Sequence, residues 1–583
     1  MREWIGPLSI RGHDMRQFDQ HDDTRISETA ALVIGRAPLW NISDPLQINT
    51  VQRGVYEGFN LVVSVCAKLL VVCMVIFLVM LPDVSARLLE LLKTATLTVF
   101  ASWYVYVLAL ILLSCFVIAC LPVSKRLRLG PDGVLPEHST KSWLAMMFCA
   151  GIGIGTLAFA VSEPVSHFLI NPDILAGTME TGGAAAVSSA MRFVYLHYGF
   201  SAWATYAIVG LALGLACHRH GQPMTMRSGL VAILGKRLEG SAGHVIDVIS
   251  ILAVIAGITT TIVIGLEQIC SGLSMLTGSR FFADNSGNPP LIALFTALVV
   301  LTAVAIASIV SGVERGVKWV SQLGFVLFFT VLAVFVVFGG GVRVLGVLAD
   351  GTVTYLKSVA VHATTIYDPK ISAASSAQRD WQGDWTIFYW AWWIAFAPFV
   401  GMFVAQISRG RTLREFILGT MIAPAFMCFI WFAGTGGTAL MLELDGTAAG
   451  AILSAEHAYR LYETVDIMLS PGVAAVFKAV LVLLFLILIV ASASAAIIAI
   501  KSIGAGGSKL AETPFHSILW AFVIAANAGA IMAVGGVASI RDVMIVSALP
   551  SSMILALMLV SVCVGIFKES RGFPRLRFPS IPS

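Results

Sequence analysis

Aromatic side chains crowd into the middle of one apolar segment, at residues 388–393. Five of these six positions are aromatic, namely Phe388, Tyr389, Trp390, Trp392 and Trp393. Tryptophans that face lipid usually lie at the two membrane interfaces. Trp392 and Trp393 instead lie roughly 10–12 Å inside the expected outer end of the segment, at about 1.5 Å per residue. Aromatic faces at this depth are suited to a cation that has lost its water.

A second aromatic group lies in the apolar segment at 190–216. Trp203 and Tyr206 are three residues apart and share one helix face. Tyr198 points about 140° away on a regular helix, but Gly199 beside it can relax that geometry. The alternative to a binding wall is an aromatic core, although buried Tyr and Trp need partners for their polar tips. We expect these rings to form a binding wall together with the 388–393 run.

Three glycines interrupt the apolar segment at 143–169, namely Gly151, Gly153 and Gly155. Glycine tolerates an unwound helix whose backbone groups can face a solute or ion. The alternative is close helix packing, because Gly151 and Gly155 also form a Gly-x-x-x-Gly pair. Glu163 and Pro164, a charge and a helix breaker near the end of the same segment, favour the functional interpretation.

Two ionisable residues fall inside apolar segments, and we consider both for coupling to an ion. Glu267 lies within the segment at 244–276, and His197 lies within the segment at 190–216. An ionisable side chain inside a membrane is by default a functional hypothesis. The alternative for Glu267 is a position close enough to the outer interface to be solvated.

A stripe of aromatic residues follows one face of the segment at 384–407. Trp392, Phe396, Phe399 and Phe403 fall at i, i+4, i+7 and i+11. A stripe at helical spacing is often simple core packing. Here we expect Trp392, Phe396 and Phe399 to line the path of a solute.

Other classes of chemistry find no support in the sequence. The nine cysteines are scattered, and no Cys-x-x-Cys or Cys/His spacing suggests a metal site. No nucleophile–base pair or phosphate-binding loop points to an enzyme, including one that acts on quaternary amines. We therefore predict no metal, no cofactor, no nucleic-acid partner and no enzymatic activity.

The composition requires a membrane protein. The 583 residues are 58% hydrophobic and only 12% charged, with a mean hydropathy of +0.88, whereas soluble proteins are about 25% charged. Twelve apolar segments are long enough to cross a bilayer, at about 59–81, 98–121, 143–169, 190–216, 244–276, 290–311, 317–339, 384–407, 415–440, 470–500, 515–538 and 544–567. We predict an all-α polytopic membrane protein with twelve transmembrane helices.

Basic residues lie in alternate loops, which sets the orientation. Lys125, Arg126 and Arg128 follow the second segment, and Arg409 follows the eighth, whereas acidic residues dominate the loop after the ninth. The positive-inside rule then puts both termini in the cytoplasm, in the cell inner (plasma) membrane. The first 50 residues lack the pattern of a cleaved signal peptide. We expect a cytosolic tail at 1–57, a transporter domain at 58–569 and a short cytosolic tail at 570–583.

The interrupted segments suggest an internal repeat. The third span contains the glycine stretch, and the eighth contains Pro398 and Gly401, five spans later. Interrupted helices at corresponding positions of two halves are typical of inverted-repeat transporters. We expect spans 3–7 and 8–12 to form two inverted five-helix repeats. The segment Val342–Asp384 is external and includes a helix on the outer surface.

Several motifs together resemble the betaine/choline/carnitine transporter family. The most specific is the tract Asp384–Phe416, which looks like the family signature around its eighth helix. Further motifs are Arg128-Leu-Gly-Pro-Asp, Pro136-Glu-His-Ser-Thr-Lys-Ser-Trp143, Ser162-Glu-Pro164 and Trp203-Ala-Thr-Tyr206. The match runs from about residue 55 to 567. The resemblance implies two inverted five-helix repeats like those of the leucine transporter, secondary transport of an onium solute by alternating access, and often a homotrimer in the lipid bilayer.

The resemblance also implies site residues. The aromatic box would be Tyr198, Trp203, Tyr206 and Trp393, beside the flexible backbone of the glycine stretch. The sequence departs from the family at Tyr198 and Phe396, where tryptophan is usual, and at Gln406, where arginine is usual. The first two changes keep an aromatic face but weaken it, because indole is the best partner for a cation.

The sequence departs most from the family at the positions that would bind the coupling ion. In sodium-coupled members, hydroxyl ligands would fall on four positions that offer no side-chain oxygen here, namely Val254, Ile258, Val490 and Ala491. Hydroxyl residues lie close to these positions, so a shift in the register of the match would restore side-chain ligands. We favour a sodium-independent carrier of a zwitterion such as glycine betaine or carnitine, with choline and sulfonium analogues as other candidates. The alternatives are a sodium-coupled betaine symporter and a solute sensor that has lost transport.

Overall fold

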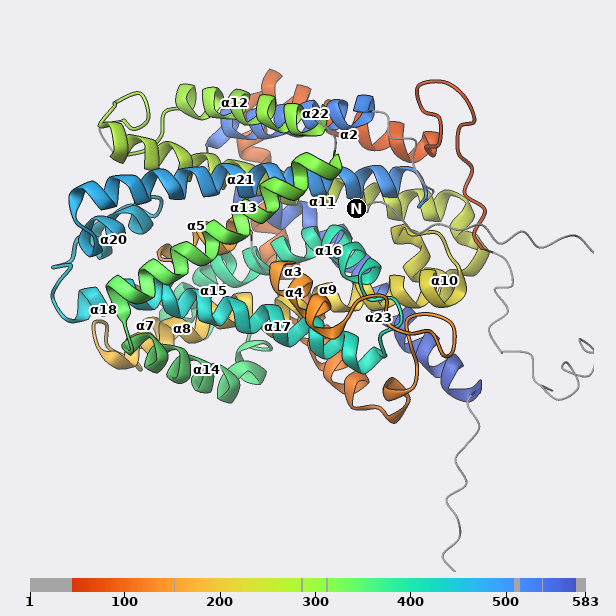
Figure 1. Ribbon diagram of the computed structural model, residues 1–583, viewed down its shortest axis with the longest axis horizontal. Coiled ribbons are helices and arrows are strands. Elements are labelled where there is room, and N and C mark those ends of the chain that lie inside the picture. Colours follow the sequence, from red (N-terminus) through yellow and green to blue (C-terminus); the bar gives the residue numbers. More distant parts are fainter. Residues whose placement is uncertain are drawn as a thin grey trace, which may run out of the picture. The chain divides into compact units, whose positions relative to one another are not determined.

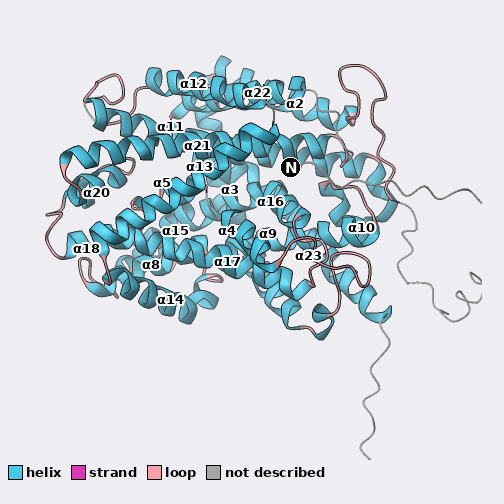
Figure 2. Cartoon of the chain, in the orientation of Figure 1, coloured by secondary structure: helices cyan, strands magenta, loops and turns pink. Residues whose placement is uncertain are grey.

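The computed structural model describes residues 45–150, 153–284, 287–310, 313–507, 514–536 and 538–572. These residues form helices joined by loops, with two isolated β-bridges and no extended strand (Figure 2). The all-α class predicted from the sequence is confirmed. Residues 44–565 form one compact unit. The chain ends group separately, and of these only 566–572, the last turns of one helix, are described.

Within the described residues, twelve helical segments are long and apolar enough to cross a membrane. They are built from α2 (Leu61–Met80), α3 (Pro82–Cys120), α8 (Ala184–Tyr198) with α9 (Phe200–Leu213), α11 (Ser241–Thr277), α12 (Leu291–Val310), α13 (Val313–Val334), α14 (Arg343–His362), α16 (Phe388–Gln406), α17 (Leu413–Gly434) with α18 (Gly436–Leu444), α21 (Pro471–Gly504), α22 (Pro514–Gly535) and α23 (Ala538–Gly572). Shorter elements connect them: α7 (Pro172–Leu175), α10 (Val231–Leu234), α15 (Ala373–Gln382), α19 (Ala451–Ser454), α20 (Arg460–Met468), 3-10 turns η1 (Pro122–Lys125), η3 (Met226–Leu230) and η4 (Gly235–Glu239), and π-helical turns η2 (Gly214–Arg219), η5 (Phe335–Gly340) and η6 (Gly383–Ile387).

The predicted count of twelve is confirmed, although the two sets of segments differ. The predicted third span, 143–169, is broken into α4 (Thr140–Ala150), α5 (Ile154–Ala158) and α6 (Ser162–Leu169). No piece of it is long enough to count as a span alone. Helix α14 takes its place in the count, although the sequence predicts a helix on the outer surface there. Within the described part of the glycine stretch, α5 begins after Gly153, whose backbone amide donates to the hydroxyl of Thr156 over 3.1 Å.

A second break separates α8 from α9 at Gly199, and only glycine fits there. A Cβ at this position would lie 2.3 Å from the backbone oxygen of Tyr195 and 2.8 Å from the hydroxyl of Tyr355. The break leaves the amide of Phe200 without its helical acceptor, and the Tyr355 hydroxyl of α14 accepts from that amide over 3.0 Å. The exposed end of α9 is therefore closed by a side chain from another helix.

The predicted interruption of span 8 at Pro398 and Gly401 is wrong. Helix α16 continues through both residues, and the irregularity lies before it, in the π-helical turn η6. Gly401 serves packing instead, because a Cβ there would lie 2.4 Å from the side chain of Val209 on α9. The missing side chain lets α16 and α9 lie close along each other (Figure 1). This contact brings the two aromatic groups of the sequence together.

Candidate functional site

A cavity of about 1020 Å³ lies among helices α5, α9, α11, α13, α16, α17 and α21. Among the described residues that line it are Gly153, Gly155, Thr156, Tyr198, Trp203, Tyr206, Thr261, Trp392, Trp393, Phe396, Phe399, Phe403, Cys428, Ala491 and Ser492. No Asp, Glu, Lys, Arg or His belongs to this lining. A charged solute would therefore meet aromatic faces, hydroxyls and backbone groups rather than a formal counter-charge.

Trp393 lies at the centre of the aromatic wall. Its ring centroid is 5.4 Å from that of Tyr198 and 6.3 Å from that of Tyr206, both edge to face. Trp203 contacts Tyr206 edge to face at 5.3 Å. The indole N–H of Trp393 donates to the backbone oxygen of His197 over 2.8 Å, in the last turn of α8 before the break. The four predicted box residues are thus brought together at one cavity.

The break at Gly199 explains how Tyr198 reaches this wall. A regular helix would turn Tyr198 away from Trp203 and Tyr206, and the change of direction at Gly199 puts all three beside the cavity. The Tyr198 hydroxyl contacts the backbone oxygen of Gly155 at 3.1 Å. A Cβ on Gly155 would lie 3.3 Å from the ring of Trp392. The glycine stretch therefore borders the aromatic wall, while predicted residue Gly151 lies outside the described residues.

Helix α16 lines the cavity along its length. Trp393, Phe396 and Phe399 are half-buried and Phe403 is exposed at 36%. Trp392 is 2% exposed and stacks on Trp393 with ring centroids 5.8 Å apart and planes 7° from parallel. The most open stripe thus runs from Trp393 rather than from Trp392, although both indoles line the cavity. The predicted path residues Trp392, Phe396 and Phe399 all belong to its wall.

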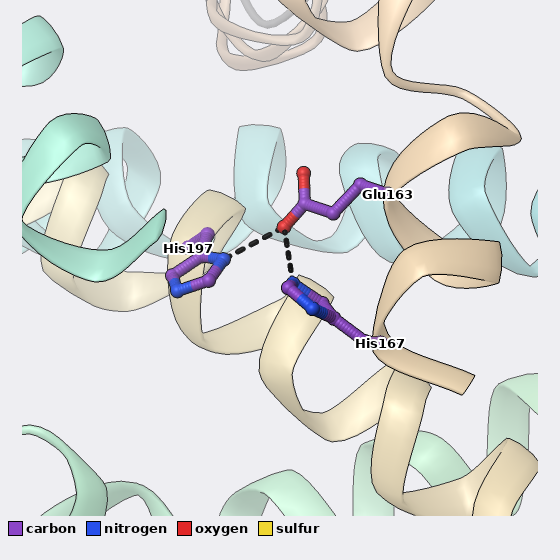
Figure 3. A group of neighbouring side chains, drawn as sticks. All are labelled: Glu163, His167 and His197. Carbon is purple, nitrogen blue, oxygen red and sulfur yellow. Dashed lines mark hydrogen bonds and ion pairs between the residues drawn. The ribbon is translucent and has the colours of Figure 1, made fainter. Parts of the chain in front are cut away.

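A buried polar cluster lies beside the cavity and is centred on Glu163 of α6 (Figure 3). Both imidazoles point at one carboxylate oxygen, with His197 Nδ1 at 2.7 Å and His167 Nε2 at 3.2 Å from Oε1. All three side chains are 0% exposed. The other carboxylate oxygen, Oε2, contacts the hydroxyl of Tyr389 on α16. His197 Nε2 lies 3.1 Å from the hydroxyl of Thr386.

This cluster connects to the cavity through two hydroxyl groups. The hydroxyls of Tyr389 and Tyr198 lie 3.0 Å apart, and that of Tyr198 reaches the oxygen of Gly155. A continuous line of polar contacts therefore runs from Glu163 to the cavity wall. His197, predicted as a coupling residue, belongs to the cluster and does not line the cavity.

The three ligand-type atoms of Glu163, His167 and His197 all lie within 4.8 Å of one another, a grouping that a metal ion can use. Neighbouring ligand atoms of a tetrahedral zinc site are roughly 3.3 Å apart, given metal–ligand bonds of about 2.0–2.1 Å. The 2.7 Å separation of Oε1 from His197 Nδ1 is shorter and typical of a hydrogen bond. We interpret the cluster as a hydrogen-bond network.

Glu267, the other predicted coupling residue, lies away from this line of contacts. It is partly exposed on α11 and does not line the cavity. Its electrostatic neighbours are Arg541 and Glu456. Two hydroxyl residues near the inferred sodium positions, Thr261 of α11 and Ser492 of α21, do line the cavity.

The sequence marked Glu163 as a charge beside a proline and as part of the Ser162-Glu-Pro164 motif, whereas His167, Thr386 and the role of Tyr389 were not predicted. A usable signal was present, because His167 follows Glu163 by four residues and so lies one turn along the same helix. The contact between Glu163 and His197 spans 34 positions and had no signal in the sequence.

Comparison with known proteins identifies relatives over most of the chain. Residues 62–571 match BCCT, the betaine/carnitine/choline family of transporters. The chain is 32% identical to a glycine betaine transporter of Acinetobacter baylyi over 88% of this chain and 74% of that protein. It is 32% identical to the glycine betaine transporter OpuD of Bacillus subtilis, over 81% and 88%. It is 30% identical to a glycine betaine/proline/choline/ectoine transporter of Vibrio parahaemolyticus, over 90% of each.

Proposed function

The chain belongs to the betaine/carnitine/choline transporter family, and we propose that it carries a quaternary-ammonium or related onium solute by alternating access. The family and its named relatives are transporters, so the chain is a multi-pass membrane transporter and not an enzyme. The family resemblance inferred from the sequence is confirmed. We further propose the inner membrane as its location, with both termini in the cytoplasm.

The observation that carries this proposal is the meeting of Tyr198, Trp203, Tyr206 and Trp393 at one cavity whose described lining contains no carboxylate. A trimethylammonium group donates no strong hydrogen bond, so aromatic faces can hold it without an acceptor. Each face contributes about 0.5–2 kcal/mol once water is excluded. Several such faces give a moderate total affinity, which suits a carrier that must also release its solute.

Glycine betaine is the first solute to test. All three relatives reported above are named for its transport, and the described glycine positions offer backbone groups on which a solute carboxylate could rest. A bare cation such as choline would lack a carboxylate partner in the described lining. We therefore expect zwitterions to be preferred over choline.

We propose that transport is sodium-independent. The resemblance, matched without gaps, places the family's sodium positions on Val254, Ile258, Val490 and Ala491, which have no side-chain oxygen, whereas sodium binding needs several oxygen ligands. A sodium-coupled carrier is the second candidate, and the specific observation that favours it is the presence of the Thr261 and Ser492 hydroxyls at the cavity.

Uptake by proteoliposomes tests these proposals. Labelled betaine, choline and carnitine are offered with a sodium gradient, a proton gradient or internal counter-solute. We expect counter-solute exchange of betaine that is unaffected when N-methylglucamine replaces sodium. Strict sodium dependence would reject the sodium-independent mechanism. Failure of every onium solute to bind or exchange would reject transport and favour a transport-deficient protein on the same fold.

The carbon analogue of betaine, 3,3-dimethylbutanoate, replaces the trimethylammonium group by an uncharged tert-butyl group and provides a matched control for the cation. It keeps the size and the carboxylate but has no positive charge. If aromatic faces hold the solute through its charge, the analogue should compete at least tenfold more weakly than betaine. Equal competition would show that the cavity selects shape alone.

A further inference from the structure

Three polar contacts connect Glu163 to the cavity. The two tyrosine hydroxyls on this path supply only two hydrogens. The links are Glu163–Tyr389, Tyr389–Tyr198 and Tyr198–Gly155. Each phenol has a single hydrogen to donate, and the Gly155 oxygen has none. Two hydrogens can make only two hydrogen bonds. A third hydrogen is needed for all three links to be hydrogen bonds at once, and Glu163 is the group at the end of the line that can provide it.

A protonated Glu163 satisfies every contact in the cluster. Its Oε2–H donates to Tyr389, which donates to Tyr198, which donates to the oxygen of Gly155. Its Oε1 then accepts N–H donors from both imidazoles, each with its single hydrogen as a neutral ring. His197 Nε2 accepts from the Thr386 hydroxyl, and the unprotonated Nδ1 of His167 needs no acceptor; that atom has no hydrogen-bond partner among the described residues.

When Glu163 is ionised, the hydrogen bond between Glu163 and Tyr389 runs in the opposite direction. The carboxylate requires Tyr389 to donate to it, so Tyr389 can no longer donate to Tyr198. The single hydroxyl hydrogen of Tyr198 can then be donated to the Tyr389 oxygen or to the Gly155 oxygen, but not to both. The protonation state of a side chain outside the cavity thus decides whether Tyr198, a wall residue, is held to the glycine stretch.

The charged surroundings allow both states of Glu163. The titratable or charged groups near the cluster are His167 on its own helix, His197 and Tyr198 on α8, Tyr389 on α16, His457 before α20, Arg460 on α20 and Arg541 on α23. Glu443 of α18 instead accepts from the amides of Gly450 and Leu453. Burial without a direct ionic partner favours the neutral carboxyl, whereas nearby guanidinium groups favour its ionisation.

The two arginines differ in how they act. Arg460 donates to the backbone oxygen of Ser162 and the hydroxyl of Ser166, on either side of Glu163 in the sequence. Burial lowers the pKa of Arg460 to about 10, so it stays charged at neutral pH. Arg541 lies over the rings of Trp385 and Phe388, 5.5 and 5.3 Å from their centroids. Neither guanidinium makes a hydrogen bond to Glu163 among the described contacts.

We propose that Glu163 is the proton-binding site of this carrier, linked to the solute site through the hydroxyls of Tyr389 and Tyr198. Proton binding fixes Tyr198 on the Gly155 oxygen and so prepares the aromatic wall before the solute arrives. Because a zwitterionic solute has no net charge, electrostatic attraction to an ionised Glu163 strengthens its binding little. Proton and solute therefore favour each other's binding, as linkage requires. This inference rests on the proposed transport function.

Solute binding at different pH values tests the linkage directly. Purified full-length protein is titrated with betaine between about pH 5.5 and 8.5, with tryptophan fluorescence as the readout. Where Glu163 titrates, the Kd should rise up to tenfold for each pH unit, and betaine binding should take up close to one proton. Glu163→Gln mimics the protonated carboxyl, since its amide can donate to Tyr389 and its oxygen can accept from the imidazoles. It should flatten the pH dependence to less than twofold and abolish proton uptake.

Three further variants distinguish titration of Glu163 from titration of another carboxyl group. Glu180→Gln makes the same chemical change on an exposed residue between α7 and α8 and should keep the wild-type pH dependence. Tyr389→Phe keeps Glu163 but ends the hydroxyl line, so betaine binding should no longer take up a proton. This variant also tests the proposal if Glu163→Gln fails to fold. Flattening by Glu267→Gln, with a normal pH dependence in Glu163→Gln, would overturn the assignment.

Transport in proteoliposomes gives the second readout. A proton gradient, acidic outside, should drive betaine accumulation by the wild type several-fold above equilibrium. Glu163→Gln should continue counter-solute exchange, at a reduced rate, but accumulate no betaine. Wild-type protein that binds and exchanges betaine equally at every pH would overturn this inference and leave the transport function standing. Wild-type protein that neither binds nor exchanges any onium solute would instead reject the transport function.

Discussion

At the scale of single residues, Trp393 connects the two parts of the site. Its ring faces Tyr198 and Tyr206 at the cavity, and its N–H is bonded to the backbone of His197. His197 in turn contacts Glu163. Trp393 is therefore fixed by the same turn of α8 that supplies the polar cluster. An anchored indole keeps its face toward the solute without losing rotamer freedom on binding.

Replacement of this indole tests the aromatic wall. We expect Trp393→Ala to weaken betaine binding about tenfold or more, since a desolvated cation–π contact is worth up to about 2 kcal/mol. Tryptophan fluorescence would lose a reporter, so displacement of labelled betaine is the better measurement. Trp103→Ala, on α3 and outside the cavity lining, is the matched control and should bind as the wild type does. An unchanged affinity in Trp393→Ala would contradict the aromatic-box assignment.

The residue types of the box could be predicted from the sequence, and the polar cluster could not. Trp203, Tyr206 and Trp393 stood out because aromatic residues at mid-membrane depth have few structural reasons to be there. Glu163 and His197 are 34 positions apart, on helices α6 and α8, which pack against each other. A single charge beside a proline gives no information about its partners. His197 was predicted as a coupling residue, but its contact with Glu163 emerged only from the structure.

At the scale of elements, helix breaks set the direction of the binding groups. The break at Gly199 turns Tyr198 toward the cavity and leaves the amide of Phe200 without a helical acceptor. The hydroxyl of Tyr355 accepts from that amide. A second break of this kind separates α17 from α18 at Thr435, between Gly434 and Gly436. Both are single-residue interruptions, the first at a glycine and the second between two glycines. The sequence predicted that Gly199 could relax the helix, and the break at Thr435 was not predicted.

Gly199→Ala should destabilise the protein. Its Cβ would overlap the Tyr195 oxygen at 2.3 Å and the Tyr355 hydroxyl at 2.8 Å. Overpacking of this kind costs about 1–3 kcal/mol, so the thermal midpoint should fall by roughly 3–10 °C. Gly346→Ala on α14 is the control, because no atom lies within 4 Å of its Cβ and alanine favours a helix. An equal midpoint for both variants would mean that the break relaxes without cost.

The misplaced interruption of span 8 has a physical reason. Pro398 lacks only one amide donor, and a long helix held by neighbours tolerates that loss inside a membrane. Gly401 looked like a breaker but provides the close approach of α16 to Val209. Proline and glycine thus predict an irregular helix correctly in the glycine stretch, where several occur together, and wrongly where each has a separate packing role.

At the scale of the whole transporter domain, the helix contacts support the proposal of two inverted repeats. Spans 3 and 4 would correspond to spans 8 and 9. In the described residues, span 4 packs on span 8 through α9 and α16, and span 3 packs on span 9 through α4 and α17. If span 3 is exchanged with span 8 and span 4 with span 9, the first of these contacts becomes the second. The breaks in spans 4 and 9 also fall in corresponding spans.

The cavity extends in one direction from the aromatic wall. Phe396, Phe399 and Phe403 continue the lining toward the end of α16 that precedes Arg409, which the basic residues predict to be cytoplasmic. In the other direction lies the Glu163 cluster, whose side chains are buried. We therefore expect this conformation to admit solute from the cytoplasmic side only.

Side-specific labelling tests that expectation. Ser492 of α21 is half-buried and lines the cavity, so Ser492→Cys places a thiol there, in a variant whose nine native cysteines are replaced. A membrane-impermeant maleimide should label it in inside-out vesicles, and betaine should protect it because the solute fills the same cavity. The cysteine-free parent measures background. In right-side-out vesicles, labelling should be slow and rise only when the carrier visits an outward-open state. Fast labelling from the outside alone would show that the Glu163 cluster does not close the outer side and would reverse the proposed orientation.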